Sequence, residues 1–117
     1  MNRQELEHYL AGFKGVEDGY PFGPEARVFK VAGKMFALVS QKDESPKLTL
    51  KCPPADTELL VGKYASVTPG YYMNKRHWIT VSLEGDLPDG MLLNLSEQSY
   101  RLVVAKLSKR EQERLQG

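Results

Sequence analysis

Three things are scarce in this sequence of 117 residues: cysteine, long apolar runs and net charge. The single cysteine, Cys52, excludes an internal disulfide and is typical of a protein in a reducing compartment. The longest apolar run covers residues 35–39, far short of the roughly 20 residues that cross a bilayer. The N-terminal residues are charged and lack the apolar core of a signal peptide. We therefore expect a cytoplasmic protein without a membrane partner.

The charges nearly cancel, because the chain contains 16 basic and 15 acidic residues and has a net charge of +1. Dedicated nucleic-acid-binding domains are often strongly basic, so the charge of the whole chain does not indicate that class. Residues 47–77 are weakly basic, since they contain five Lys or Arg residues and only two Asp or Glu residues. A patch for an anionic partner and an ordinary solvated face both explain this local excess.

Sequence motifs of common enzymes are absent. The glycines form neither a dinucleotide-binding fingerprint nor a phosphate-binding loop, and no nucleophile elbow occurs. Cys52, His8 and His77 are not spaced as metal ligands. We expect Cys52 to be a small buried residue, because a catalytic cysteine needs a base that only the folded chain could supply, as His77. The sequence therefore predicts no catalytic residue, no metal and no cofactor, and a binding module rather than an enzyme.

Helix signals stand at both ends of the chain. Asn2 and Glu5 form a capping-box pattern before apolar residues at helical spacing, which predicts a helix over residues 3–12. The same pattern beginning at Ser108 predicts a short helix over residues 109–115. Both patterns satisfy backbone N–H groups that the first turn of a helix leaves without partners.

Prolines mark the start of two further helices. Residues 53–54 are both proline and can open one helix, because a proline in the first turn has no donor to lose. Pro88 can open another, which reaches to about residue 107 with a break or kink at Ser96 and Ser99. The buried face of the first of these two helices is expected to consist of Leu59, Leu60 and Tyr64.

Strand patterns occupy the middle of the chain. Runs of β-forming residues at 27–31 and 35–39 flank a turn and predict a hairpin. The second run is apolar throughout, so we expect it in the centre of a sheet and covered on both faces. Residues 47–51 alternate strictly, with both leucines facing inward and Thr49 facing outward together with the two lysines. Residues 78–83 alternate as well and form a fourth strand.

Loops are expected where glycine and proline gather. Residues 69–70 suit a type II turn, and residues 15–24 suit a long loop. In that loop Tyr20 and Phe22 are expected to form a buried clasp over the first helix, with a second binding surface as the alternative. The first three strands have short connections and must be mostly antiparallel. We therefore predict an α+β fold with a single antiparallel sheet of about four strands and helices packed on it, in one monomeric domain of residues 1–117.

Residues 69–78 gather unusual side chains beside the predicted turn. Aromatic faces can stack on bases, Lys75 and Arg76 can contact phosphate, and Asn74 can read a base edge. The alternative is structural, with Trp78 packed in the core and Asn74 present because it favours turns. The same side chains could also hold an anionic small molecule or an acidic protein surface.

Six segments follow one another along nearly the whole chain: residues 20–25, 28–31, 33–37, 48–52, 69–78 and 99–100. The most specific stretch is Asn74-Lys75-Arg76-His77-Trp78. Together these segments resemble the MmcQ/YjbR family. The resemblance implies an α+β fold with a curved antiparallel sheet, likened to the double-wing domain of a phage transcription factor. The family is commonly labelled DNA-binding, so the resemblance also implies DNA binding. That label rests on analogy between folds. Tyr72 stands where relatives often have histidine and Ile79 where they often have a polar residue, so the loop offers no second histidine.

These observations favour a non-enzymatic DNA-binding module of the MmcQ/YjbR family. Lysine and arginine would contact phosphates, while Asn74 and Tyr72 would contact bases or sugars. The alternative is a domain that binds a small molecule or a protein, with the same loop lining a pocket beside Tyr71 and Trp78. The candidate binding residues are Lys47, Lys51, Tyr72, Asn74, Lys75, Arg76 and His77.

Overall fold

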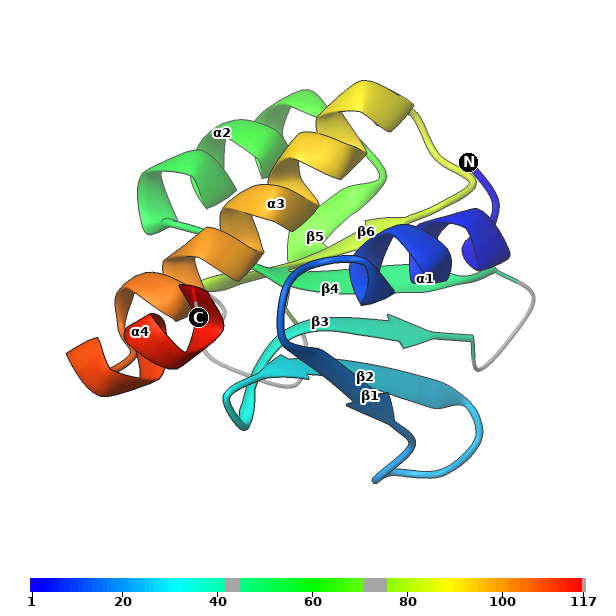
Figure 1. Ribbon diagram of the computed structural model, residues 1–117. Coiled ribbons are helices and arrows are strands. Elements are labelled where there is room, and N and C mark those ends of the chain that lie inside the picture. Colours follow the sequence, from blue (N-terminus) through cyan, green and yellow to red (C-terminus); the bar gives the residue numbers. More distant parts are fainter. Residues whose placement is uncertain (42–44, 71–75, 117) are drawn as a thin grey trace.

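A computed structural model describes residues 1–41, 45–70 and 76–116 of the chain (Figure 1). The strands form one antiparallel sheet in the order β1-β2-β3-β4-β6-β5. The predicted α+β class is confirmed, with six strands in place of about four. Along the chain the elements are α1 (Arg3–Ala11), β1 (Val16–Gly19), β2 (Ala26–Val31), β3 (Lys34–Ser40), β4 (Lys47–Lys51), α2 (Pro54–Lys63), β5 (Val67–Pro69), β6 (Trp78–Ser82), α3 (Asp89–Ala105) and α4 (Lys109–Gln116).

Two strands correct the predictions from sequence. β1 lies where a loop was predicted and β5 where a turn was predicted. Both are edge strands that pair with one neighbour only, so their own residues show no clear alternation. Pro69 is compatible with an edge strand because one side of such a strand needs no donor. Gly70 donates its N–H to the carbonyl of Trp78 at 2.7 Å and so continues the pairing with β6.

The predicted capping boxes are confirmed at both ends of the chain. In α1 the side chain of Asn2 accepts the N–H of Glu5, and the carboxylate of Glu5 accepts the N–H of Asn2. Before α4 the hydroxyl of Ser108 and the carboxylate of Glu111 form the same reciprocal pair. These bonds fix where the two helices begin.

The middle helices depart from the predictions. α3 is continuous, because the hydroxyl of Ser96 donates to a carbonyl of its own helix and that of Ser99 donates to the sheet. The predicted break is therefore wrong. The expected buried position of Leu59 is also wrong, since 71% of its side chain is exposed. Leu60 and Tyr64 do pack against the core, as predicted, on the side of α2 where Thr57 is buried. α2 packs near the edge strand β5.

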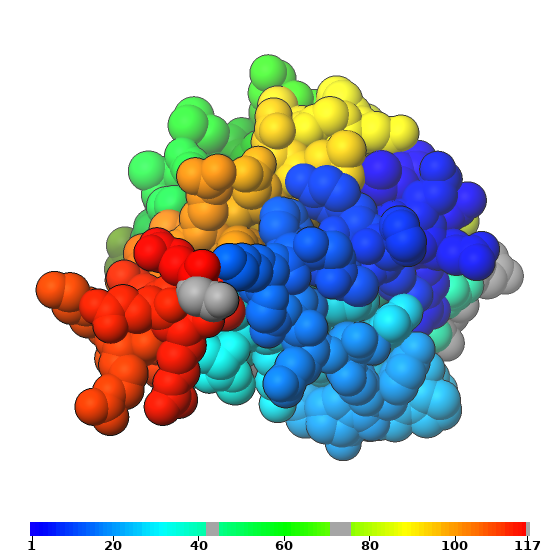
Figure 2. All heavy atoms as spheres, in the orientation of Figure 1, coloured from blue at the N-terminus to red at the C-terminus, as the bar shows by residue number. Residues whose placement is uncertain are grey.

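One face of the sheet is covered by α1 and α3, and their side chains close over it (Figures 1 and 2). Three aromatic rings join these layers, with Phe13 and Tyr100 stacked at 4.8 Å and both edge-on to Phe36. Each such ring pair stabilises the fold by about 1 kcal/mol, in addition to the stabilisation from the apolar area that the rings bury. The core on this face also contains Leu6, Leu10, Phe29, Val31, Ala37, Val39, Leu48, Leu50, Ile79 and Val81.

The hairpin of β2 and β3 is confirmed. Its two-residue turn has positive φ at both positions, 50° at Ala32 and 77° at Gly33. This matches the turn type whose twist suits a two-residue hairpin, and glycine adopts it without strain. The turn thereby sets the register that places Lys30 opposite Met35.

Candidate functional site

The face of the sheet turned away from α1 and α3 is called the open face below. In β4 both leucines face the helices, so Lys47, Thr49 and Lys51 face the open side, as the alternation predicted. Thr49 is nevertheless buried, with 2% of its surface exposed, and its hydroxyl forms a hydrogen bond with that of Thr80 on β6. The centre of the open face is therefore shielded from solvent, and the lysines of β4 lie toward the ends of the strand.

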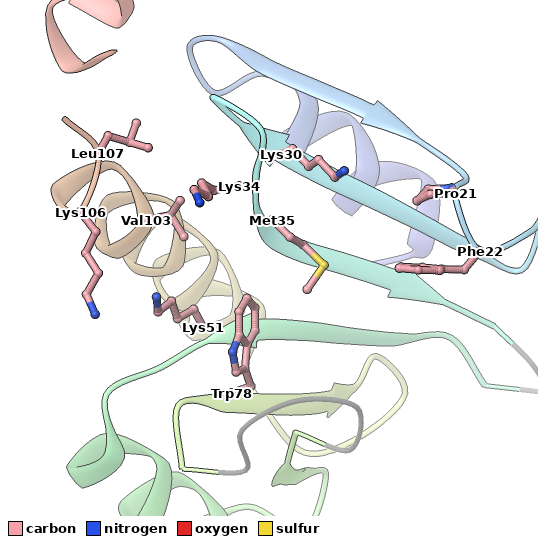
Figure 3. Close-up of a pocket in the computed structure, with 10 residues that line it drawn as sticks. All are labelled: Pro21, Phe22, Lys30, Lys34, Met35, Lys51, Trp78, Val103, Lys106 and Leu107. Carbon is pink, nitrogen blue, oxygen red and sulfur yellow. The ribbon is translucent and has the colours of Figure 1, made fainter. Parts of the chain in front are cut away.

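A pocket of about 730 Å³ lies against the open face (Figure 3). Its walls come from the loop before β2, the β2–β3 hairpin, the end of β4, the start of β6 and the C-terminal end of α3. Phe22 and Leu107 stand at opposite ends of it in Figure 3. The volume falls in the range of small-molecule and cofactor sites. The lining residues are Pro21, Phe22, Lys30, Lys34, Met35, Lys51, Trp78, Val103, Lys106 and Leu107.

A bulge in β3 turns Met35 toward the pocket. Phe29 pairs with Ala37 and Lys30 pairs with Met35, so β3 has one residue more than β2 between these pairs. The extra residue is Phe36. Phe36 and Ala37 are neighbours, yet both face the core under the helices, so the alternation of sides shifts by one residue. Met35 therefore lines the pocket on the open face. The uniformly apolar sequence of β3 thus reflects a bulge. β3 lies in the interior of the sheet, as predicted, and the predicted burial on both faces is confirmed for residues 36–39. Leu38, the cross-strand partner of Thr49 on the open face, is only 5% exposed.

Ser99 of α3 joins β3 and β4 at the point where these strands separate beside the pocket. Its hydroxyl accepts the N–H of Lys51 at 2.9 Å and donates to the carbonyl of Phe36 at 2.6 Å. In an antiparallel ladder these two backbone groups would bond to each other directly. The serine stands between them, is fully buried, and fixes the backbone of Lys51 at the rim of the pocket.

The pocket is positively charged. Four of its lining side chains are lysines, and none of those in the described part of the chain is a carboxylate. The ion pairs found within residues 1–41, 45–70 and 76–116 use arginines and the N-terminal amine, not these lysines. Burial lowers the pKa of Lys51, and the charge of Lys106 lowers it further. A bound anion would oppose both effects by stabilising the protonated amine.

The structure brings together some of the predicted site residues. Lys51 lines the pocket. Lys47 lies on the same face but about 13 Å along the strand, at four residues of roughly 3.3 Å each. Arg76 and His77 are exposed and directly precede Trp78, which is half-buried in the pocket wall. The other three predicted residues, Tyr72, Asn74 and Lys75, lie outside the described residues.

Sequence reasoning missed most of the pocket. Lys30 lies between the buried Phe29 and Val31, so strand alternation could have placed it on the open face. Lys106 stands at the end of α3 and joins the pocket only through folding, which no local pattern reveals. The expected buried clasp at Phe22 is wrong, because its side chain is 76% exposed and lines the pocket.

Cys52 has the environment of a structural residue. It is 1% exposed, as predicted, and burial raises the pKa of its thiol, which opposes formation of a nucleophilic thiolate. The side chain of His77 is exposed, and only its backbone carbonyl contacts Cys52, by accepting the N–H at 2.7 Å. Within the described ranges, no three His, Cys, Asp or Glu side chains gather as metal ligands. No helix in those ranges is long and apolar enough to cross a membrane.

The sequence model of the YjbR family matches residues 11–102. The chain belongs to the YjbR family. YjbR-family relatives include YbdF of Escherichia coli O157:H7, which is 43% identical over 100 residues, or 86% of this chain and 82% of YbdF. YjbR of Escherichia coli strain K12 is 35% identical over 104 residues, covering 89% of this chain and 88% of the relative. Both names describe the relatives as uncharacterised proteins.

Solved structures of similar proteins have the same fold. The Deinococcus radiodurans protein DR2400 is 34% identical with a TM-score of 0.87, over 96% of this chain and 86% of DR2400. A Pseudomonas syringae protein is 29% identical with a TM-score of 0.76, over 87% of this chain and 98% of its own. The region that matches the YjbR family contains Lys30, Lys51 and Trp78, while Lys106 lies just beyond it.

Proposed function

We propose that this YjbR-family protein is a DNA-binding module, not an enzyme, and that it contacts DNA through the open face. The observation that carries the proposal is the group of four lysines around one pocket with an aromatic wall. Lysines supply the phosphate contacts that dominate nucleic-acid affinity, and their effect is strongest where no carboxylate competes. The raised pKa of the buried Cys52 thiol supports the non-enzymatic part of the proposal.

The distribution of charge favours a chain of phosphates over a single anion. The four lysines come from β2, β3, β4 and α3, so they surround the pocket instead of converging from one loop. Lys47 continues the positive face along β4, and Arg76 is exposed beside the start of β6. A polymer with a phosphate at each unit can use such separated cations together.

A small anionic molecule is the second candidate, and the pocket volume of about 730 Å³ favours it. An acidic protein surface matches less well, because these lysines line a recess. Intrinsic fluorescence of Trp78, measured against a panel of anionic metabolites, separates the two candidates. Saturation by one metabolite at micromolar concentration, with no response to DNA, would favour the small molecule.

The direct test is fluorescence anisotropy of labelled DNA titrated with wild-type protein and with Lys51→Met and Lys47→Met variants. We expect salt-sensitive binding, with a slope of log K against log salt no steeper than about −5 if the four pocket lysines, Lys47 and Arg76 all contact phosphates. Lys51→Met should weaken binding more than Lys47→Met, because only Lys51 lines the pocket within the described residues.

The Lys47→Met variant is the matched control, since it removes the same charge from the same strand and face. Circular dichroism and thermal unfolding check that both variants fold. Absence of binding to any DNA at low salt, or equal losses in the two variants, would contradict the proposed function or its location.

A further inference from the structure

The pocket is suited to a flat group that carries a phosphate. We propose that the protein binds a single-stranded segment of nucleic acid and takes one unpaired nucleotide into this pocket. The inference rests on the function proposed above and specifies the form of its ligand. It concerns the described lining residues alone.

The base would lie against the apolar part of the pocket. Trp78 at the start of β6 and Met35 beside the bulge form its wall, and Phe22 stands at one end (Figure 3). Phe22 is 76% exposed, so the face of its ring is accessible to solvent at the end of the pocket. Aromatic faces that solvent can reach are the usual platform for unstacked bases, whatever their sequence.

The phosphate would lie at the lysines beside that wall. Lys51 is the cross-strand partner of Trp78, so the two side chains stand side by side on the open face. Lys106 lines the same pocket as Lys51 (Figure 3), and its charge contributes to lowering the pKa of Lys51. A phosphate there would be held by both amines while its own base reaches Trp78. Lys30 and Lys34 on the hairpin are placed for the next phosphate.

A duplex fits this surface less well than a single strand does. Its bases are stacked on each other and present only their edges in the grooves, so their flat faces cannot enter a pocket. A helix is the common reader of the major groove, but α1 and α3 lie on the opposite face of the sheet. A sheet face with aromatic residues and flanking cations is typical of proteins that bind single strands.

Trp78 is the only tryptophan of the chain, so intrinsic fluorescence reports on the pocket directly. The experiment titrates the full chain with oligomers of about 10 nucleotides, within the range of single-strand sites. The arms are single-stranded DNA, single-stranded RNA of the same sequence, the matching DNA duplex, an abasic single strand and a nucleoside monophosphate. Anisotropy of labelled oligomers gives affinities in parallel.

The expected result is quenching of Trp78 by single strands that carry bases, with affinity at least tenfold above those of the duplex and the abasic strand. Quenching by DNA or by RNA supports the inference, and the tighter of the two identifies the natural source. Phe22→Ala should weaken single-strand binding by about fivefold or more, which corresponds to the loss of one stacked base. Tyr20→Ala is the matched control, because Tyr20 is also exposed but does not line this pocket among the described residues.

Four results would overturn the inference. A duplex that binds as tightly as the single strand would contradict the preference for single strands but would not contradict the proposed DNA-binding function. An abasic strand that binds equally well would show that the pocket holds no base. A monophosphate that binds as tightly as an oligomer would show that the ligand is a free nucleotide and that the strand adds nothing. Absence of binding to every nucleic acid would overturn both this inference and the proposed function.

Discussion

The two faces of the sheet use alternate residues of the same strands for different purposes. In β4, Leu48 and Leu50 face α1 and α3 and are fully buried, while Lys51 faces the other way and lines a charged pocket. The helix-covered face has stacked aromatic rings around Phe36, whereas the open face has the exposed ring of Phe22. The difference shows that a period-two pattern can place core leucines and pocket-lining lysines on opposite faces of one small sheet.

If this division holds, substitutions on the helix-covered face should change the free energy of unfolding, and those on the open face should mainly change binding. Substitutions at residues with contrasting surroundings test this division. The predictions below run from the largest expected effect to the smallest.

The largest difference is expected between two phenylalanines. Phe36→Ala removes a fully buried ring that contacts Phe13 and Tyr100, and should lower the free energy of unfolding by about 3–5 kcal/mol. Phe22→Ala removes an exposed ring and should change it by about 0.5 kcal/mol or less. Urea denaturation followed by circular dichroism measures both. Similar losses in the two variants would contradict the division.

The second difference concerns serine. Ser99→Ala leaves the N–H of Lys51 and the carbonyl of Phe36 without their shared hydrogen-bond partner, at a cost of about 2–4 kcal/mol. Ser45→Ala removes a partly exposed hydroxyl that pairs with Ser82, and should cost about 0.5 kcal/mol. Thermal unfolding of the two variants compares them. A small effect at Ser99 would mean that the strands can close and bond directly.

Glycine supplies the third comparison. A Cβ at Gly70 would lie 2.5 Å from the Cβ of Trp78 and 3.0 Å from its backbone, so Gly70→Ala should destabilise the protein by about 1–3 kcal/mol. A Cβ at Gly62 in α2 meets nothing within 4 Å, so Gly62→Ala should stabilise it by about 0.5–1 kcal/mol. Denaturation midpoints give the signs. A neutral Gly70→Ala variant would show that β5 and β6 are not packed this closely.

The smallest effect is the pH dependence of Lys51. Because its pKa is lowered in the folded protein, the unfolded chain holds this proton more tightly, and the charged amine destabilises the fold. Stability should therefore rise with pH between the lowered pKa and the ordinary value of 10.5. Lys51→Met should raise stability at neutral pH by about 0.5 kcal/mol or less, and this gain should shrink across that window. Urea denaturation at several pH values checks it, and a gain that grows with pH would contradict the assignment.

Local patterns predicted the elements that carry their own signals. The capping boxes at Asn2 and Ser108 and the alternation of β4 were confirmed because each depends on residues a few positions apart. The edge strands β1 and β5 were missed because their pairing is decided by neighbouring strands. The bulge at Phe36 was missed because an apolar run has the same composition with or without it.

The candidate site was only partly predictable for the same reason. Lys51 could be placed outward by alternation, and Trp78 stood out by its type. The bond from Ser99 to two strands and the approach of Lys106 to Lys51 depend on how α3 lies across the sheet. No spacing in the sequence encodes these contacts.

We propose that the open face binds nucleic acid while the helix-covered face stabilises the fold. The most direct measurement is a titration of ¹⁵N-labelled protein with a single-stranded oligonucleotide, followed by amide and indole NMR shifts. The account predicts shifts at Lys30, Met35, Lys51 and the Trp78 indole, with α1 unchanged. Shifts centred on α1 or α2, or no shifts at low salt, would contradict it.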